Sequence, residues 1–219
     1  MTAPSLLNDD GDASIATALM MSHHAFRRDL RRFAAALEVV EASRLDALGD
    51  EWTRFRMALH AHHESEDHGV FPSLASRGVD AALARLEADH RLIDPLLERG
   101  DRAFAGRSAA DAAGVVRELR ALLDAHLALE EAAIIPLLRE RRVFPPLPDD
   151  AAAEMYAQGF AWAMHGVAPD VVARVYAMLP QNLVANLPAA REAFAARYRS
   201  VWGDVAIGAT RTSVPDLAA

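Results

Sequence analysis

The chain has 219 residues, of which 52% are hydrophobic and 25% are charged, and its formal net charge is -8. This balance is typical of a globular protein and excludes wholesale disorder. The sequence contains neither cysteine nor lysine. Disulfides, thiolate nucleophiles, iron–sulfur clusters and lysine Schiff bases are therefore excluded. The negative net charge argues against a protein that binds nucleic acid.

Residues 1–12 show neither the basic start nor the apolar core of a signal peptide. The sequence has no run of about 18 uninterrupted apolar residues, so we expect no membrane span and no membrane partner. The lack of cysteine suits a reducing compartment. Together these features predict a soluble, cytoplasmic protein.

The apolar spacing predicts four long helices, over residues 14–41, 44–70, 79–99 and 108–142, with Gly100 ending the third. Residues 1–13 before them are expected to form a flexible tail. The connections are short, which predicts that consecutive helices are antiparallel neighbours. The fold class is therefore all-α, with an up-down-up-down four-helix bundle over residues 14–143.

A C-terminal helical extension is predicted over residues 149–203, packed on the bundle and followed by a loose tail over 204–219. The extension should contain two or three shorter helices. Gly166 is expected to stop one of them, and Pro180 and Pro188 are expected to divide the later part of the extension.

Each bundle helix should present one apolar stripe to the core. Every stripe is interrupted by one histidine, and two stripes also carry a glutamate four residues after it, on the same helix face. Burial of an unpaired carboxylate costs several kcal/mol, and no stripe offers an arginine, so a metal ion is the natural partner. The candidate ligands are His23, His62, Glu66, His90, His126 and Glu130.

Other polar residues near these stripes have weaker claims to a role at the metal. His63 shares a polar face with Asp67, which favours a solvated or supporting role over ligation. Asp94, four residues after His90, lies at the edge of its stripe and is a candidate extra ligand. His165, in the extension, is expected to be structural, with ligation as the alternative.

Four imidazoles and two carboxylates exceed what one tetrahedral zinc ion needs. They suit two metal ions of intermediate hardness, with iron first, manganese second and zinc as a further substitute. If both glutamates bridge, each ion receives two nitrogens and two oxygens, and an oxo or hydroxo bridge adds a fifth donor. One position then stays open for a small ligand.

Four short motifs surround the candidate ligands. They are Ser-His-His-Ala-Phe-Arg at 22–27, His-His-Glu-Ser-Glu at 62–66 with Phe71-Pro72 after it, Asp-His-Arg-Leu-Ile-Asp at 89–94, and His-Leu-Ala-Leu-Glu-Glu at 126–131 leading to Pro136. In this combination the chain resembles the hemerythrin-like (HHE cation-binding) domain proteins, over roughly residues 14–143. The resemblance implies that the six candidate ligands bind a non-haem di-iron centre.

One departure from that family separates this sequence from its oxygen carriers. Oxygen-carrying hemerythrins have five histidines and two carboxylates, with a second histidine where this chain has Asp94. This difference argues against reversible oxygen carriage. The order His, His-x3-Glu, His, His-x3-Glu is similar to bacterial relatives associated with peroxide or nitric-oxide chemistry and with iron-centre repair.

The leading hypothesis is a cytoplasmic di-iron protein that binds or turns over a small oxidant: O2, hydrogen peroxide or nitric oxide. Its enzymatic form would be a peroxide- or NO-consuming activity, with no catalytic residues beyond the metal ligands. The alternatives are an iron-centre repair protein and an iron or oxygen sensor that binds a protein partner, or a second copy of itself, through the extension. The apolar residues behind the sensor hypothesis are Met155, Tyr156, Phe160, Trp162 and Met164.

Overall fold

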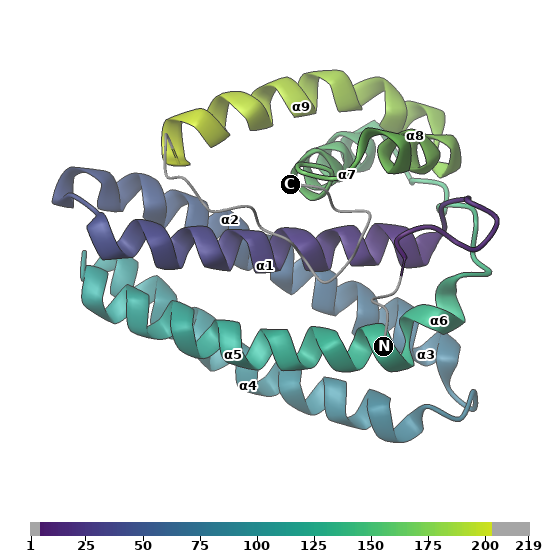
Figure 1. Ribbon diagram of the computed structural model, residues 1–219, viewed down its shortest axis with the longest axis horizontal. Coiled ribbons are helices and arrows are strands. Elements are labelled where there is room, and N and C mark those ends of the chain that lie inside the picture. Colours follow the sequence, from purple (N-terminus) through teal and green to yellow (C-terminus); the bar gives the residue numbers. More distant parts are fainter. Residues whose placement is uncertain (1–4, 203–219) are drawn as a thin grey trace. The chain divides into compact units, whose positions relative to one another are not determined.

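The computed structural model describes residues 5–202 of the chain (Figure 1). These residues form helices joined by short connections, and no strand occurs among them. They divide into two compact units, one built from residues 5–25 and 135–202 and the other from 26–134. The predicted all-α class is confirmed, whereas the tail predicted over 204–219 lies outside the described residues.

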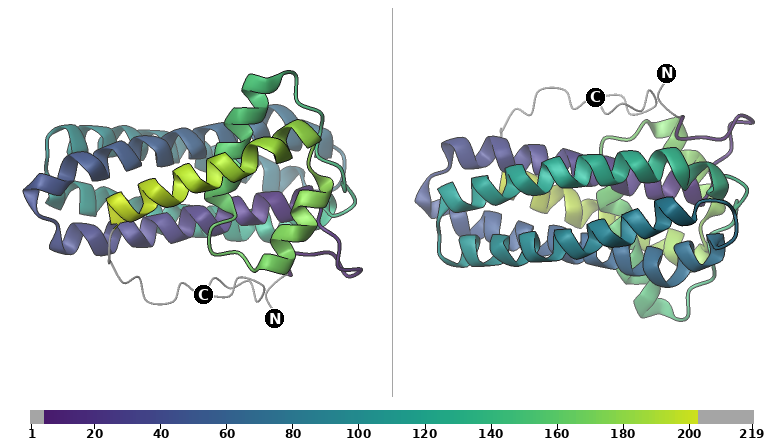
Figure 2. Two further views of the ribbon diagram at one scale, coloured as in Figure 1. Left: turned by 90° about the horizontal axis from the view of Figure 1, so that it is seen from above. Right: turned by 90° about the horizontal axis from the view of Figure 1, so that it is seen from below.

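The unit of residues 26–134 is the four-helix bundle. Short connections join consecutive helices, and α4 packs on both α2 and α5. Figures 1 and 2 show α4 and α5 lying side by side along their length. The predicted up-down-up-down order is confirmed. Its helices are α1 (Ile15–Val39), which contributes residues to both units, α2 (Leu45–Ser65), α4 (Asp80–Ala105) and α5 (Ala109–Ala133).

Gly100 does not end a helix, and the prediction that it does is wrong. Helix α4 continues five residues further, to Ala105. A Cβ built on Gly100 would lie 2.1 Å from Cζ2 of Trp52. The glycine is therefore explained by the close approach of the Trp52 ring on α2, not by the backbone freedom that glycine gives a helix end.

Aromatic rings fill the part of the bundle core around Trp52. The Trp52 ring stacks on Phe55, with centroids 5.6 Å apart, and lies 5.4 Å from Phe104. Phe33 of α1 meets Trp52 edge-on at 5.7 Å. The indole N–H of Trp52 donates to Asp101 Oδ1 at 3.0 Å, so the one polar atom of this ring has a partner.

Helix α2 changes its winding after Ser65. Residues Glu66–Val70 form a π-helical turn, which leads directly into the short helix α3 (Phe71–Leu74). A π turn inserts an extra residue into the helical repeat and re-aims the side chains that come after it, and such turns are frequent at functional sites. The single helix predicted over 44–70 is thus irregular at its C-terminal end.

Between residues 135 and 202 the other unit contains four helices, and α7 packs on α9. The carboxylate of Asp149 caps α7 by accepting the N–H of Ala152 at 2.8 Å. Pro188 lies inside α9 and does not divide it, so that prediction is wrong; the helix tolerates the loss of one N–H donor. The helices are α6 (Ile135–Leu138), α7 (Asp150–Ala163), α8 (Pro169–Met178) and α9 (Gln181–Trp202).

In the same unit, the segment before α1 makes specific contacts. Leu6 is fully buried, and its carbonyl accepts the hydroxyl of Thr17 at 2.7 Å. The Asn8 amide donates to the carbonyl of Arg139 at 2.9 Å, and the Arg139 guanidinium donates to the carbonyl of Leu7 at 2.9 Å. These bonds join the start of the chain to the residues directly after α6.

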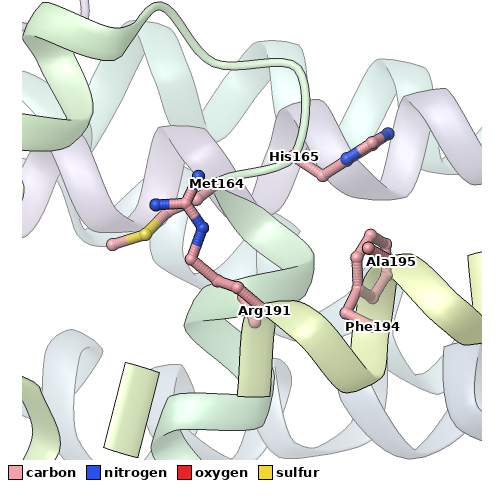
Figure 3. A pocket seen from close by; sticks show the side chains of 6 residues that line it. Met164, His165, Arg191, Phe194 and Ala195 are labelled. Atoms are coloured by element: carbon pink, nitrogen blue, oxygen red, sulfur yellow. The ribbon is translucent and has the colours of Figure 1, made fainter. Parts of the chain in front are cut away.

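A hollow of about 120 Å³ lies between α7 and α9 (Figure 3). Its walls include Met164 and His165, which come after α7, and Arg191 and Phe194 of α9. The His165 ring packs on Phe194 and Tyr198, with centroid distances of 5.2 and 4.6 Å.

Within residues 5–202, no helix combines the length and the hydropathy needed to span a bilayer.

Candidate metal centre

All six predicted ligands are buried in helices. His23 lies on α1, His62 in the last turn of α2 and Glu66 at the first position of the π turn, while α4 and α5 carry the other three. Four of the six are fully buried, including both glutamates. Two carboxylates without contact to water need positive or hydrogen-bonding partners to be tolerated in a core.

One group of donors lies entirely within the bundle unit. Its members come from α2, the π turn, α4 and α5, and one ligand atom of each lies within 4.8 Å of those of the others. This spacing allows four donors to surround a single metal ion. The members are His63, Glu66, His90 and His126.

A second set of donors shares Glu66 with the first. His62, Glu66 and Glu130 also have ligand atoms within 4.8 Å of one another. Glu66 Oε1 lies 2.8 Å from Nε2 of His62, whereas its Oε2 lies 3.5 Å from Nε2 of His90. The two oxygens of one carboxylate thus face histidines of different sets.

His23 is placed by the continuity of α1. It is fully buried, and it lies three residues before Phe26, hence on the same face of this unbroken helix. The ring of Phe26 contacts the ring of His62, with centroids 5.2 Å apart. The helical repeat therefore puts His23 on the face of α1 that carries the neighbour of His62.

His63 is the residue that sequence reasoning underrated. It is 4% exposed, and its ring stacks on His90 with centroids 3.9 Å apart and planes 16° apart. Its Nε2 is buried without a hydrogen-bond partner among the described residues. Burial lowers the pKa of His63, and the neighbouring imidazoles of His90 and His62 lower it further, so the ring is neutral and offers a lone pair.

The histidine doublet was the available signal for His63. Adjacent helical residues point about 100° apart, so a narrow stripe that takes one histidine from a helix can leave the second histidine of a doublet out. Here both face donors: His62 meets Glu66, and His63 meets His90 and His126. A search for one histidine in each helix therefore misses the second residue.

Three other polar residues lie outside both sets of donors. Asp94, the candidate extra ligand, is exposed and belongs to neither set. Glu131 pairs with Arg27, with Oε1 2.5 Å from Nη1, so its charge is balanced by the arginine. His165 lies at the hollow between α7 and α9, and it too belongs to neither set.

His90 is held at both of its ring nitrogens. Asp67 accepts from Nδ1, with its two oxygens 3.0 and 3.2 Å away, while Nε2 faces Glu66. Burial lowers the pKa of His90, but the hydrogen bonds to Glu66 and Asp67 raise it by more, so the net shift is upward. Nδ1 of His126 also lies near a carboxylate, 4.0 Å from Asp89 Oδ2.

The donor set fits a metal centre better than a polar core. Imidazole nitrogens and carboxylate oxygens are ligands for iron, manganese and zinc. They come from different helices, they are buried, and a neutral imidazole nitrogen lies unpartnered among them. A family model described as "Hemerythrin HHE cation binding domain" matches residues 14–138.

The chain belongs to the hemerythrin HHE cation-binding family. No curated protein and no solved structure matches the chain significantly. The matched hemerythrin domain includes both sets of donors and ends at the last residue of α6. Most of the C-terminal helices, including the hollow at His165, lie beyond it.

Within this hemerythrin domain, the π turn lets α2 contribute to both donor sets. Glu66 opens the turn and is shared, and Asp67 comes next and reaches His90. The ring of Phe71, the first residue after the turn, stacks on the ring of His90, with centroids 5.9 Å apart. The end of α2 and the π turn therefore supply donors to both sets and pack against a histidine of α4.

Proposed function

We propose that this hemerythrin-domain protein holds a non-haem di-iron centre and uses it to bind or turn over a small oxidant. The observation that carries the proposal is Glu66: it is fully buried, and its two oxygens face His62 and His90, which belong to different donor sets. A carboxylate shared in this way suits two adjacent metal ions. Manganese or zinc would be substitutes with the same ligand types.

In this proposal His63, His90 and His126 would hold one iron, His62 and Glu130 would hold the other, and Glu66 would be available to both. His23, which the sequence predicts as a ligand and which is fully buried on α1, would be a further ligand of the second iron. The chain would then supply five histidines and two glutamates. The fifth histidine would be His63 of α2, because α4 carries an exposed aspartate, Asp94, at the alternative position.

The protein side chains define what could react there. The donors are buried, so only ligands as small as O2, hydrogen peroxide or nitric oxide would reach them without local opening. When bound, the irons would supply Lewis acidity and electrons. The aspartate at His90 Nδ1 would hold a proton on the outer edge of that imidazole, away from the donor group. We also propose that the protein is cytoplasmic.

Elemental analysis of the full chain, purified without a metal-affinity tag, tests the metal. We expect about two irons per chain, and a large loss of iron in Glu66→Gln. Glu64→Gln is the matched control, because Glu64 is two residues away on α2 and its side chain is 61% exposed. The same samples, assayed for O2, peroxide and NO binding or consumption, then test the oxidant.

Three results would overturn this proposal in whole or in part. A wild-type chain that binds no iron after anaerobic loading would remove the metal centre. Equal iron content in Glu66→Gln and wild type would remove the shared carboxylate on which the two-iron assignment depends. A chain that binds iron but does not respond to any of the three oxidants would keep the cation-binding part of the proposal and contradict its oxidant part.

A second candidate function is a sensor that acts through its C-terminal helices. The supporting observation is that Met155 and Tyr156, adjacent on α7, are 63% and 40% exposed. Sedimentation of the full chain, with and without iron, tests whether a second copy binds there. An iron-dependent dimer that Met155→Ser disrupts would support the sensor, and a monomer under all conditions would contradict self-association.

A further inference from the structure

His90 is a candidate ligand whose two ring nitrogens both face carboxylates. Nδ1 lies 3.0 and 3.2 Å from the two oxygens of Asp67, and Nε2 lies 3.5 Å from Oε2 of Glu66. These two acids are consecutive in the chain. Glu66 is fully buried, whereas the side chain of Asp67 is 36% exposed, so one lies inside the donor group and the other at its edge.

The winding of the chain explains how neighbours can reach opposite edges of one ring. Consecutive side chains of a helix diverge by about 100°, which leaves room for an imidazole between them. Both acids belong to the π turn Glu66–Val70, where the helical repeat is widened. The ring of His90 enters this space from α4, the facing helix.

Stacking alone cannot orient His90. Its ring is stacked against those of His63 and Phe71, and both make interplanar angles of 16° with it. These contacts fix the plane of the imidazole. A half-turn of the ring about its Cβ–Cγ bond keeps that plane, yet it exchanges the positions of nitrogen and carbon atoms. Only a polar partner at one edge distinguishes the two orientations.

We propose that Asp67 is a positioning residue that fixes His90 as the Nδ1–H tautomer, with Nε2 directed at the donor group. A histidine that ligates a metal commonly donates its other N–H to a carboxylate, which sets the tautomer and the ring orientation. The consequence for metal binding rests on the proposed function. The consequence for the tautomer does not, because it depends on the hydrogen bond in the metal-free chain.

The first test is the tautomer itself, read from the ¹⁵N and ¹³C shifts of His90 in the full, metal-free chain at a pH where imidazoles are neutral. Wild type should show Nδ1 protonated, and Asp67→Ala should show a mixture or the other tautomer. Asp67→Asn keeps an oxygen that accepts a hydrogen bond, and it should lie between them. Asp94→Asn, an exposed aspartate four residues after His90, is the control that should match wild type.

The second test is iron affinity, measured by competition with a chelator. Loss of a carboxylate that orients a metal-ligating histidine typically weakens affinity by about 10- to 100-fold. Asp67→Ala should show this loss and Asp67→Asn a smaller one, with Asp94→Asn unchanged. A wild-type chain that binds no iron would overturn the proposed function, while the tautomer measurement would still decide the role of Asp67.

The inference is overturned if Asp67→Ala keeps the wild-type tautomer of His90. Should Asp67→Ala fail to fold, Asp67→Asn decides the question by the same spectra. A purely structural role would lower the stability of both variants and leave the His90 shifts and the iron affinity as in wild type, which also counts against the proposal.

Discussion

The bundle has two kinds of core along the same four helices. Around Trp52 the core is a cluster of aromatic rings, whose one polar atom is paired with Asp101. Around Glu66 the core consists of histidines and glutamates as deeply buried as those rings. The first region stabilises the fold by removing apolar surface from water. The second removes charged and polar groups from water, which opposes folding.

The two regions thus have opposite effects on the stability of the metal-free chain. Marginal stability of about 5–15 kcal/mol leaves little room for a polar core unless apolar packing elsewhere offsets it. The aromatic cluster provides that packing in the metal-free chain. A metal ion bound by the donor groups should stabilise the polar region directly, so the two regions should respond in different ways to mutation and to metal.

The largest expected effect is in the aromatic region. Trp52→Ala removes a ring that is 1% exposed and contacts Phe33, Phe55 and Phe104. The free energy of unfolding should fall by about 3–5 kcal/mol, because truncation of a buried aromatic loses its burial and leaves a cavity. Urea unfolding of the metal-free protein measures this. Met57→Ala, on the same helix and 62% exposed, should change it by less than about 0.5 kcal/mol.

The next effect separates the two regions by their response to iron. Iron that binds only the folded state should raise the free energy of unfolding, by about 2.7 kcal/mol at a free concentration 100 times Kd. Glu66→Gln should lose most of this increment. Trp52→Ala, although much less stable, should keep it, because its ring contributes no donor. An equal iron increment in wild type and Glu66→Gln would erase the distinction between the two cores.

Sequence periodicity predicted the helices well because it depends on burial alone. Stripes that repeat every three to four residues mark the core face of a helix whatever fills the core. The same rule identified Glu66 and Glu130 as buried charges, which is why a metal was predicted. The rule could not predict the winding of α2 after Ser65, because the π turn leaves no distinct mark in this sequence.

The errors have a common cause: one residue type can serve two physical roles. Glycine suits a helix end and also a close approach, and Gly100 serves the latter under Trp52. Proline can divide helices or lie within one, as Pro188 does in α9. His63 looked like a surface residue beside His62, yet the facing helices α4 and α5 bury it. Each case depends on a partner distant in sequence.

A smaller effect tests whether the aromatic region is closely packed. Gly100→Ala would place a Cβ 2.1 Å from the Trp52 ring, so the helices or the ring must shift. Overpacking of this kind lowers the free energy of unfolding by about 1–3 kcal/mol. Gly114→Ala on α5 is the matched control, since its Cβ would meet no atom within 4 Å. That control should gain about 0.5–1 kcal/mol from helix propensity, and a similar gain at Gly100 would show that the contact with Trp52 is loose.

The smallest expected effect is the change in stability as the pH falls, and it should depend on residues of the polar region alone. The pKa of His63 is lowered in the folded state from its ordinary value of 6.5, so the unfolded chain binds a proton there that the folded chain excludes. Its contribution to stability is complete above pH 6.5 and is lost as the pH falls, by up to about 1.4 kcal/mol per pH unit. The raised pKa of His90 acts in the opposite sense: its contribution is complete below 6.5 and is lost as the pH rises through the folded value.

Unfolding of the metal-free chain between pH 7.5 and 5.5 measures the balance of these two histidines. In His63→Gln the free energy of unfolding should fall less steeply below pH 6.5. The reason is that the unfolded variant has no imidazole at position 63 to take up a proton. Met57→Gln, at a position on α2 that is 62% exposed and carries no titratable group, should leave the pH dependence as in wild type. Trp52→Ala should lower the free energy of unfolding by the same amount at every pH, without changing its pH dependence. If His63→Gln instead lowers the free energy of unfolding equally at every pH, as Trp52→Ala should, then His63 contributes only packing. The two regions of the core would then differ only in composition.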